Sequence, residues 1–175
     1  MRFRYATLLG ASLTITVATG DATIFVPMSV EDLTRNSTAI VIGTVASVDG
    51  EEAGGKIYTL VTLTVEEDLK GTASALLTIK EKGGIAGNRR QTVFGTPEFQ
   101  VGERVLLFLT QRSDGSWRTN QMALGKFRIE TTAVGTVHAV QSFGPGTTVL
   151  VSRNTAPPPG ALLLDDLLAT VRRAL

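Results

Sequence analysis

The stretch with the clearest capacity for chemistry is rich in glycine and carries two arginines: Gly83-Gly84-Ile85-Ala86-Gly87-Asn88-Arg89-Arg90. Glycines leave backbone amides open to an anion, and the arginines beside them add positive charge. A phosphate-binding loop would also need a Lys-Ser or Lys-Thr ending and a following helix, and neither is present. We therefore predict a hairpin loop whose glycines adopt positive φ angles. As a recognition loop it supplies the candidate partner-binding residues Gly83, Gly84, Asn88, Arg89 and Arg90.

His138 is the only histidine, and the chain has no cysteine. A zinc site draws its ligands from several Cys, His and acidic residues, so only carboxylates could join His138. A Ser-His-Asp triad would need this imidazole, yet no Gly-x-Ser-x-Gly elbow is present. We expect His138 to lie on the solvent face of a strand. No catalytic residue, metal ion or cofactor is predicted, and the chain is not expected to be an enzyme.

Two acidic clusters stand out, Asp49–Glu52 and Glu66–Asp68. Paired carboxylates hydrolyse glycosides when they face each other across a cleft that also offers aromatic platforms. The chain has one Trp, two Tyr and seven Phe, and most of them fall in apolar strand patterns. We interpret both clusters as solvated turns and strand ends. Calcium binding at the first cluster would lack the spacing of a known calcium loop.

The N-terminus has the order of a secretory signal peptide. Two arginines precede an apolar stretch, Ala6–Val17, and small residues follow it. The stretch is too short to span a bilayer. We predict that residues 1–22 form a cleaved signal peptide, with cleavage after Gly20 or Ala22, and that the mature protein is exported to the periplasm or the extracellular space. No second apolar segment is long enough for a membrane span.

The charge of the mature chain limits its partners. Loss of the two N-terminal arginines takes the formal net charge from +1 to −1. A nearly neutral protein does not suit a nucleic-acid surface that depends on many phosphate contacts, so no nucleic-acid partner is predicted. The basic and aromatic pairs that an oligonucleotide or sugar site on a barrel would need occur only at Trp117-Arg118 and Lys126-Phe127-Arg128.

The elements that must position these residues are mainly strands. Val105–Leu109 is an apolar run after a turn at Gly102-Glu103, which favours a central strand buried on both faces. Gly43 indicates a bulge inside the first long strand. Together the strands favour an all-β fold, an OB-type closed or partly open β-barrel of about five to seven strands. The other predicted segments are strands at Thr38–Val48, Ile57–Glu67, Leu76–Lys82, Gln91–Phe94, Trp117–Glu130 with a break at Gly125, and Val137–Val140, and a polar hairpin loop at Asp49–Lys56.

Short helices are predicted near both ends of the mature chain. Ser29 can cap the first one, which begins with acidic residues and ends at Asn36-Ser37. The second covers Leu162–Leu175, with its apolar residues on one stripe. An irregular connector, residues 142–160, precedes it. We expect the stripe to dock on the barrel, so that residues 23–175 form one domain with 161–175 as its closing helix.

The order of these signals resembles the netrin-like domain, the OB-type barrel shared with tissue inhibitors of metalloproteinases. The matching residues are Asn36–Val45, Tyr58–Val65 and Leu69-Lys70-Gly71. The second half, from Gly83-Gly84 through Gly95-Thr96-Pro97 to Leu109, is similar to a group of uncharacterised secreted bacterial proteins. The resemblance covers the middle of the mature chain.

The resemblance implies a barrel that binds an extracytoplasmic protein, such as a metalloprotease. Tissue inhibitors chelate the protease zinc with an N-terminal cysteine held by disulfides, and this chain has no cysteine. Chelation by that residue therefore does not carry over, and the N-terminal segment Thr23, Ile24, Phe25 and Val26 remains as a candidate partner-binding strand. We expect an exported, non-enzymatic binding module, protein-binding or inhibitor-like. An envelope module for a glycan or polymer and a hydrolase with a carboxylate pair are the alternatives.

Overall fold

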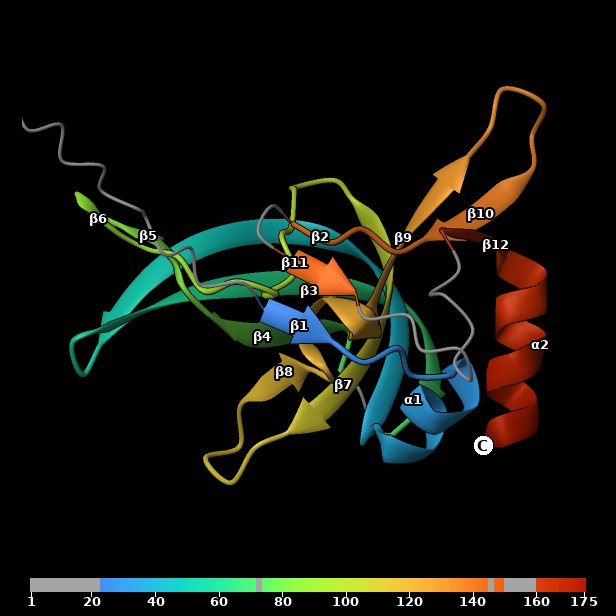
Figure 1. Cartoon of the computed structure of the whole chain (residues 1–175), viewed down its shortest axis with the longest axis horizontal. Helices are drawn as coiled ribbons and strands as arrows, with labels where there is room; N and C mark the ends of the chain where they lie inside the picture. Colours follow the sequence, from blue (N-terminus) through green and yellow to red (C-terminus); the bar gives the residue numbers. More distant parts are fainter. Residues whose placement is uncertain (1–22, 72–73, 145–146, 150–159) are drawn as a thin grey trace, which may run out of the picture.

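The computed structural model describes residues 23–71, 74–144, 147–149 and 160–175. The predicted signal peptide and most of the predicted connector lie outside the described residues. The predicted all-β fold with a small helical part is confirmed (Figure 1). The elements are β1 (Thr23–Phe25), α1 (Val30–Asn36), β2 (Ala39–Ala53), β3 (Lys56–Lys70), β4 (Leu76–Lys82), β5 (Gly84–Ala86), β6 (Arg89–Gln91), β7 (Arg104–Gln111), β8 (Trp117–Thr119), a 3₁₀ helix (Met122–Gly125), β9 (Lys126–Thr131), β10 (Val137–Val140), β11 (Thr147–Val149), β12 (Ala161–Leu163) and α2 (Leu164–Ala174).

Strands of the main sheet form a ring. The sheet has the order β12-β10-β9-β7-β2-β3-β4-β8, and β8 also pairs with β7. Strands β7, β2, β3, β4 and β8 therefore close on themselves. Neighbours in the ring run antiparallel except β4 and β8, which run parallel and meet at Ile79 and Trp117. Strands β9, β10 and β12 extend the sheet outward from β7.

Strand β2 bends because its pairing with β3 shifts register repeatedly between Ile40 and Ser47. Gly43 lies at one of these shifts, so the predicted bulge is confirmed. A side chain could not fit there, since a Cβ on Gly43 would lie 2.4 Å from the Thr64 carbonyl oxygen. The bends let one 15-residue strand serve both the ring and a long hairpin with β3.

The ring encloses an inner core. Alternate residues of each strand point inward, as the period of a strand requires. Strand β7 contributes Val105, Leu107 and Leu109, which pack with Val41 of β2 and Ile79 of β4, and all of them are fully buried. This cluster fills the space that the five strands surround.

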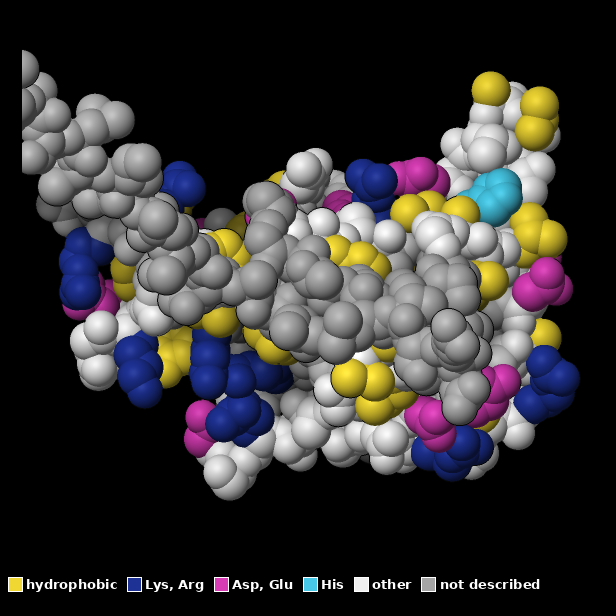
Figure 2. Space-filling view, viewed as in Figure 1, with side chains coloured by type: hydrophobic (Ala, Val, Ile, Leu, Met, Phe, Trp, Pro, Cys, Tyr) yellow, Lys and Arg dark blue, Asp and Glu magenta, His cyan; other side chains and the backbone are white. Residues whose placement is uncertain are grey.

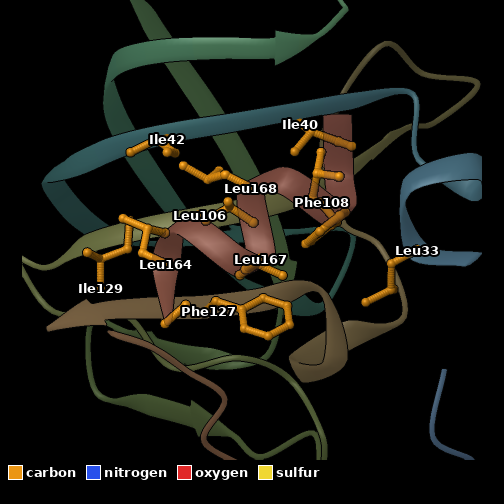
Figure 3. Close-up of a cluster of buried hydrophobic side chains, with 12 residues drawn as sticks. Leu33, Ile40, Ile42, Leu106, Phe108, Phe127, Ile129, Leu164, Leu167 and Leu168 are labelled. Carbon is orange, nitrogen blue, oxygen red and sulfur yellow. The ribbon is translucent and has the colours of Figure 1, made fainter. Parts of the chain in front are cut away.

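An outer core covers the other face of β2 and β7. Ile40, Ile42, Leu106 and Phe108 point away from the ring and pack under α1 and α2 (Figure 3). Because Val105–Leu109 contributes to both cores, the central strand is buried on both faces, as predicted. Helix α2 docks on this face through the predicted apolar stripe, with Leu164, Leu167, Leu168 and Val171 buried.

The helix boundaries follow from local chemistry. The Asp32 N–H donates to Ser29 Oγ at 3.1 Å, which confirms the predicted cap of α1. Helix α2 begins at Leu164 rather than Leu162, because Ala161–Leu163 pairs with β10 as β12. None of the described helices is long and apolar enough to cross a membrane.

Three predicted boundaries of strands are wrong. The break predicted at Gly125 extends over residues 120–125, because a 3₁₀ helix separates β8 from β9. The predicted loop Asp49–Lys56 is strand except at Gly54 and Gly55, whose φ angles of +58° and +73° form the turn. The charged residues stay extended because the ladder with β3 continues to the tip. The strand predicted at Gln91–Phe94 is also wrong, since β6 ends at Gln91.

Candidate functional site

The tip of the β2–β3 hairpin projects beyond the ring. It lies with β5 and β6 at one end of the long axis, while α2 and the β9–β10 hairpin lie at the other end (Figure 1). We call residues 49–60 and 80–91 the hairpin end. It contains the predicted recognition loop and one of the two acidic clusters. The helices cover the opposite part of the molecule.

The outer face of the hairpin end carries polar and aromatic side chains in register. Tyr58 on β3 lies opposite Lys82 on β4 and opposite Glu51 on β2. Lys80 Nζ lies 2.6 Å from Glu51 Oε2 and 4.5 Å from the centre of the Tyr58 ring. The ion pair and the cation–π contact are partly exposed, so each contributes about 1 kcal/mol or less. Figure 2 shows Lys and Arg side chains gathered at the lower left, on the side where β4 and β8 lie in Figure 1.

The predicted loop Gly83–Arg90 is a short hairpin, β5–β6. Gly87 has a φ of +58° and Asn88 has no positive φ, which together fit a two-residue type II′ turn. The predicted positive φ angles are also found at Gly83 (+86°) and Gly84 (+121°). Asn88 lies exposed at the tip of this hairpin.

Gly83 and Gly84 attach the start of the β5–β6 hairpin to β3. The Gly83 N–H donates to the Ile57 carbonyl at 2.8 Å, and Thr59 Oγ1 donates to the Gly83 carbonyl at 2.8 Å. A Cβ on Gly84 would lie 2.2 Å from Thr59 Oγ1. A Cβ on Gly83 would lie 2.9 Å from the Gln91 carbonyl oxygen, and both glycines have positive φ angles, so neither position suits a larger residue.

The β5–β6 hairpin lies on the inner face of the β2–β3 hairpin, opposite Tyr58. Gly50 pairs with Thr59 and leaves room for the Ile85 carbonyl, to which a Cβ would come within 1.7 Å. The Ile57 N–H donates to Gln91 Oε1 at 2.8 Å. Side-chain and backbone contacts thus fix β5 and β6 to the long hairpin at several points.

Unpaired cations outnumber unpaired carboxylates on the hairpin end. Arg89 forms an ion pair with Glu52, and Lys80 forms one with Glu51. Within the described residues, no ion-pair partner is found for the exposed residues Lys56, Lys82 and Arg90. Asp49 is an exposed carboxylate that accepts a hydrogen bond from the Ser47 hydroxyl. Among the described residues, the hairpin end therefore exposes more unpaired positive than unpaired negative charge.

The N-terminal part of the predicted site lies elsewhere. Thr23–Phe25 forms β1, which pairs in parallel with β11 in a separate two-stranded sheet. Val26 follows it and is 67% exposed. No strand pairing joins β1 to the β5–β6 hairpin among the described residues. A role of Thr23–Val26 in partner binding stays a prediction.

Glu81 is a buried carboxylate that we did not single out from the sequence. It is 2% exposed, and its Oε1 accepts the Thr119 N–H at 2.7 Å, where β4 meets β8. The Arg118 Nε lies 3.9 Å from Oε2. Burial raises the pKa of the Glu81 carboxyl, although Thr119 and Arg118 oppose the shift. The strand period could have located it, because Leu77 and Ile79 face inward and Glu81 continues their phase.

Lys126 is a second buried ionisable residue outside the predicted site. Its Nζ donates to both carboxylate oxygens of Glu103 at 2.8 Å and to the Glu98 carbonyl, and it lies 4.5 Å from the centre of the Phe99 ring. Burial lowers the pKa of Lys126, and Glu103 opposes the shift. These contacts attach the segment before β7 to β9, so we assign Lys126 a structural role.

The basic and aromatic pairs singled out in the sequence do not form open platforms. Trp117 is half-buried and packs on the inner core, and Phe127 is 1% exposed in the outer core. His138 lies half-buried on β10, opposite Glu130.

The second acidic cluster, Glu66–Asp68, lies inside β3 rather than in a turn. A hydrogen bond from Thr44 lowers the pKa of Glu66, burial opposes the shift, and the nearby Arg104 lowers the pKa further. Among the described residues there is no group of three or more His, Asp or Glu side chains placed to hold a metal ion.

A scan against protein-family models found no match to this sequence, and a search of curated proteins found no relative.

Proposed function

We propose that this chain is an exported, non-enzymatic binding module that holds an anionic partner protein at its hairpin end. The observation that carries the proposal is that the helices cover one part of the sheet, whereas unpaired positive side chains lie on another part. Helices α1 and α2 cover the outer face of β2 and β7. The hairpin end remains open and carries Lys56, Lys82 and Arg90 without ion-pair partners among the described residues.

We further propose that the ring is an OB-type barrel of the netrin-like kind. Its five strands close on one another with a single parallel pair, which agrees with a small closed or partly open Greek-key barrel. OB-type barrels recognise ligands on the face of their second and third strands and on the adjoining loops. In this chain those strands are β3 and β4, which carry Tyr58, Lys80 and Lys82.

A protein partner suits this surface better than a glycan. Sugar sites use exposed aromatic rings as platforms, whereas the Tyr58 ring is covered by Lys80 and Trp117 packs on the inner core. Export is supported by the N-terminal charge and apolar pattern, which lies outside the described residues. A metalloprotease is one partner that the netrin-like resemblance suggests.

Recovery of the partner from the native exported fraction tests the proposal. Three tagged forms are compared: the wild type, Lys82→Gln/Arg90→Gln, and the matched control Arg172→Gln/Arg173→Gln, which loses two exposed charges from α2. We expect the wild type and the control to retain the same partner protein. The hairpin-end variant should retain about tenfold less, because charge-assisted contacts are lost. Equal retention by all three forms, or turnover of ester, glycoside or peptide substrates by the purified protein, would contradict the proposal.

A further inference from the structure

We infer that β6 is an open strand edge to which an extended, acidic segment of the partner protein adds as a further strand. This inference rests on the proposed binding function and specifies how the partner is held. Strand addition obtains affinity from backbone hydrogen bonds and selectivity from alternate side chains.

The backbone of Arg90 faces away from β5. Ala86 pairs with Arg89 next to the two-residue turn, and Ile85 pairs with Arg90 one step farther. In such a hairpin the pair beside the turn exchanges hydrogen bonds and the next pair does not. The N–H and C=O groups of Arg90 therefore point outward. Within the described residues, β6 pairs with β5 alone.

The charge at this edge selects the partner's chemistry. Arg90 is exposed and has no ion-pair partner among the described residues, whereas the neighbouring Arg89 is paired with Glu52. A strand beside β6 would place one of its side chains next to the Arg90 guanidinium, and a carboxylate there would form a charge-assisted pair. In an extended segment alternate residues share a face, so an acidic residue at every second position places all the carboxylates on the Arg90 face. The residues between them lie on the other face and can be apolar.

A second explanation of the same residues makes different predictions. Natural proteins often protect a free strand edge with charged side chains, and Arg89 and Arg90 could do only that. An anionic polysaccharide could also bind the cations but would leave the backbone edge unused. The two cases differ from strand addition in whether the Arg90 amide becomes protected.

The test uses the mature chain and a synthetic peptide of alternating Glu and Val. We expect the peptide to bind, and hydrogen exchange of the Arg90 amide to slow by about tenfold or more when it is bound. The same peptide with N-methyl groups on alternate backbone amides should lose binding, because it cannot pair with the edge. A Lys-Val peptide serves as the charge control and should not bind. Unchanged exchange at Arg90, equal binding of the N-methylated peptide, or binding of a polyuronate chain in place of the peptide would overturn strand addition.

Two substitutions at Arg90 distinguish the contribution of its backbone N–H to binding from that of its side-chain charge. Arg90→Gln keeps the backbone donor and should weaken peptide binding by about tenfold. Arg90→Pro removes the outward N–H as well and should weaken binding further, while no hydrogen bond within the hairpin is lost. Should Arg90→Pro unfold, the N-methylated peptide makes the same comparison with the wild-type protein. If the native partner requires Lys82 and Arg90 but no peptide binds, the binding function stands and strand addition fails. If neither partner nor peptide binds, both fail.

Discussion

At the scale of single residues, the Glu81 side chain adds a hydrogen bond between β4 and β8, where the ring closes. Strands β4 and β8 pair at Ile79 and Trp117, and two residues later the Glu81 carboxylate accepts the Thr119 N–H. Burial disfavours the charged carboxylate, so folded Glu81 keeps its proton to a higher pH than unfolded Glu81 does. Between the ordinary pKa of 4.5 and the raised folded pKa, the native state binds more protons. The contribution of Glu81 to the free energy of unfolding therefore falls as pH rises through that window.

Replacement of Glu81 separates its charge from its hydrogen bond. Glu81→Gln keeps an oxygen acceptor for the Thr119 N–H and removes the charge, so its free energy of unfolding should depend less on pH between about pH 5 and about pH 8. At about pH 8 it should be at least as stable as the wild type. Glu81→Leu leaves the buried N–H unpaired and should cost about 1–3 kcal/mol. Urea unfolding at both pH values measures these differences. A Gln variant with the pH dependence of the wild type, or as unstable as the Leu variant, would contradict this role.

At the scale of elements, β7 organises the fold because both of its faces are buried. Leu107 belongs to the inner core, while Leu106 and Phe108 belong to the outer core beneath the helices. The strand pairs with β2, β8 and β9, so it is shared by the ring and by the outer extension of the sheet. Loss of packing at β7 should therefore affect the whole unfolding transition.

Leu107→Ala should lower the free energy of unfolding by about 2–5 kcal/mol, because it removes fully buried contacts and leaves a cavity. Leu76→Ala is the matched control, since Leu76 is 61% exposed on β4 and its loss should change stability by about 0.5 kcal/mol or less. Denaturant unfolding of both variants gives the comparison. A cost for Leu107→Ala close to that of the control would show that β7 is not central.

The elements that were predicted correctly from the sequence are those whose structure is determined by residues close together in the chain. Leu76–Lys82 alternates apolar and polar residues and is β4 as predicted, and Ser29 caps α1 as predicted. Asp49–Ala53 looked like a loop because its residues are polar. Pairing with β3, a distant segment, keeps it extended. The 3₁₀ helix was not predicted, because Gln121 and Met122 at its start have φ angles of +53° and +56°, which residues of these types rarely adopt.

The candidate site was also only partly predictable, because its arrangement depends on contacts between segments that are far apart in the chain. Glycines and arginines identified the hairpin at Gly83–Arg90, but they could not show that Gly83 and Gly84 pack against β3. The roles of Tyr58 and Lys82 depend on which strands pair, and that register involves residues far apart in the chain. Sequence alone therefore located the β5–β6 hairpin but not the side chains on the outer face of the hairpin end.

At the scale of the whole molecule, the closing helix and the hairpin end lie far apart. Helix α2 and the β9–β10 hairpin occupy one end of the long axis, and the hairpin end occupies the other (Figure 1). The outer core connects the helices to the ring, and the hairpin end projects from the other side of the ring. A partner held at the hairpin end would not need to disturb either core.

The most direct test of this account is photo-crosslinking of the intact protein in its native exported compartment. A photoreactive residue is placed at Lys82 or Arg90 on the hairpin end, or at Val134, which is 87% exposed on the loop between β9 and β10. We predict discrete adducts with one partner protein from Lys82 and Arg90, and none from Val134. Adducts from Val134 alone, equal adducts from all three positions, or no adduct from any would contradict the assignment of the hairpin end as the binding surface.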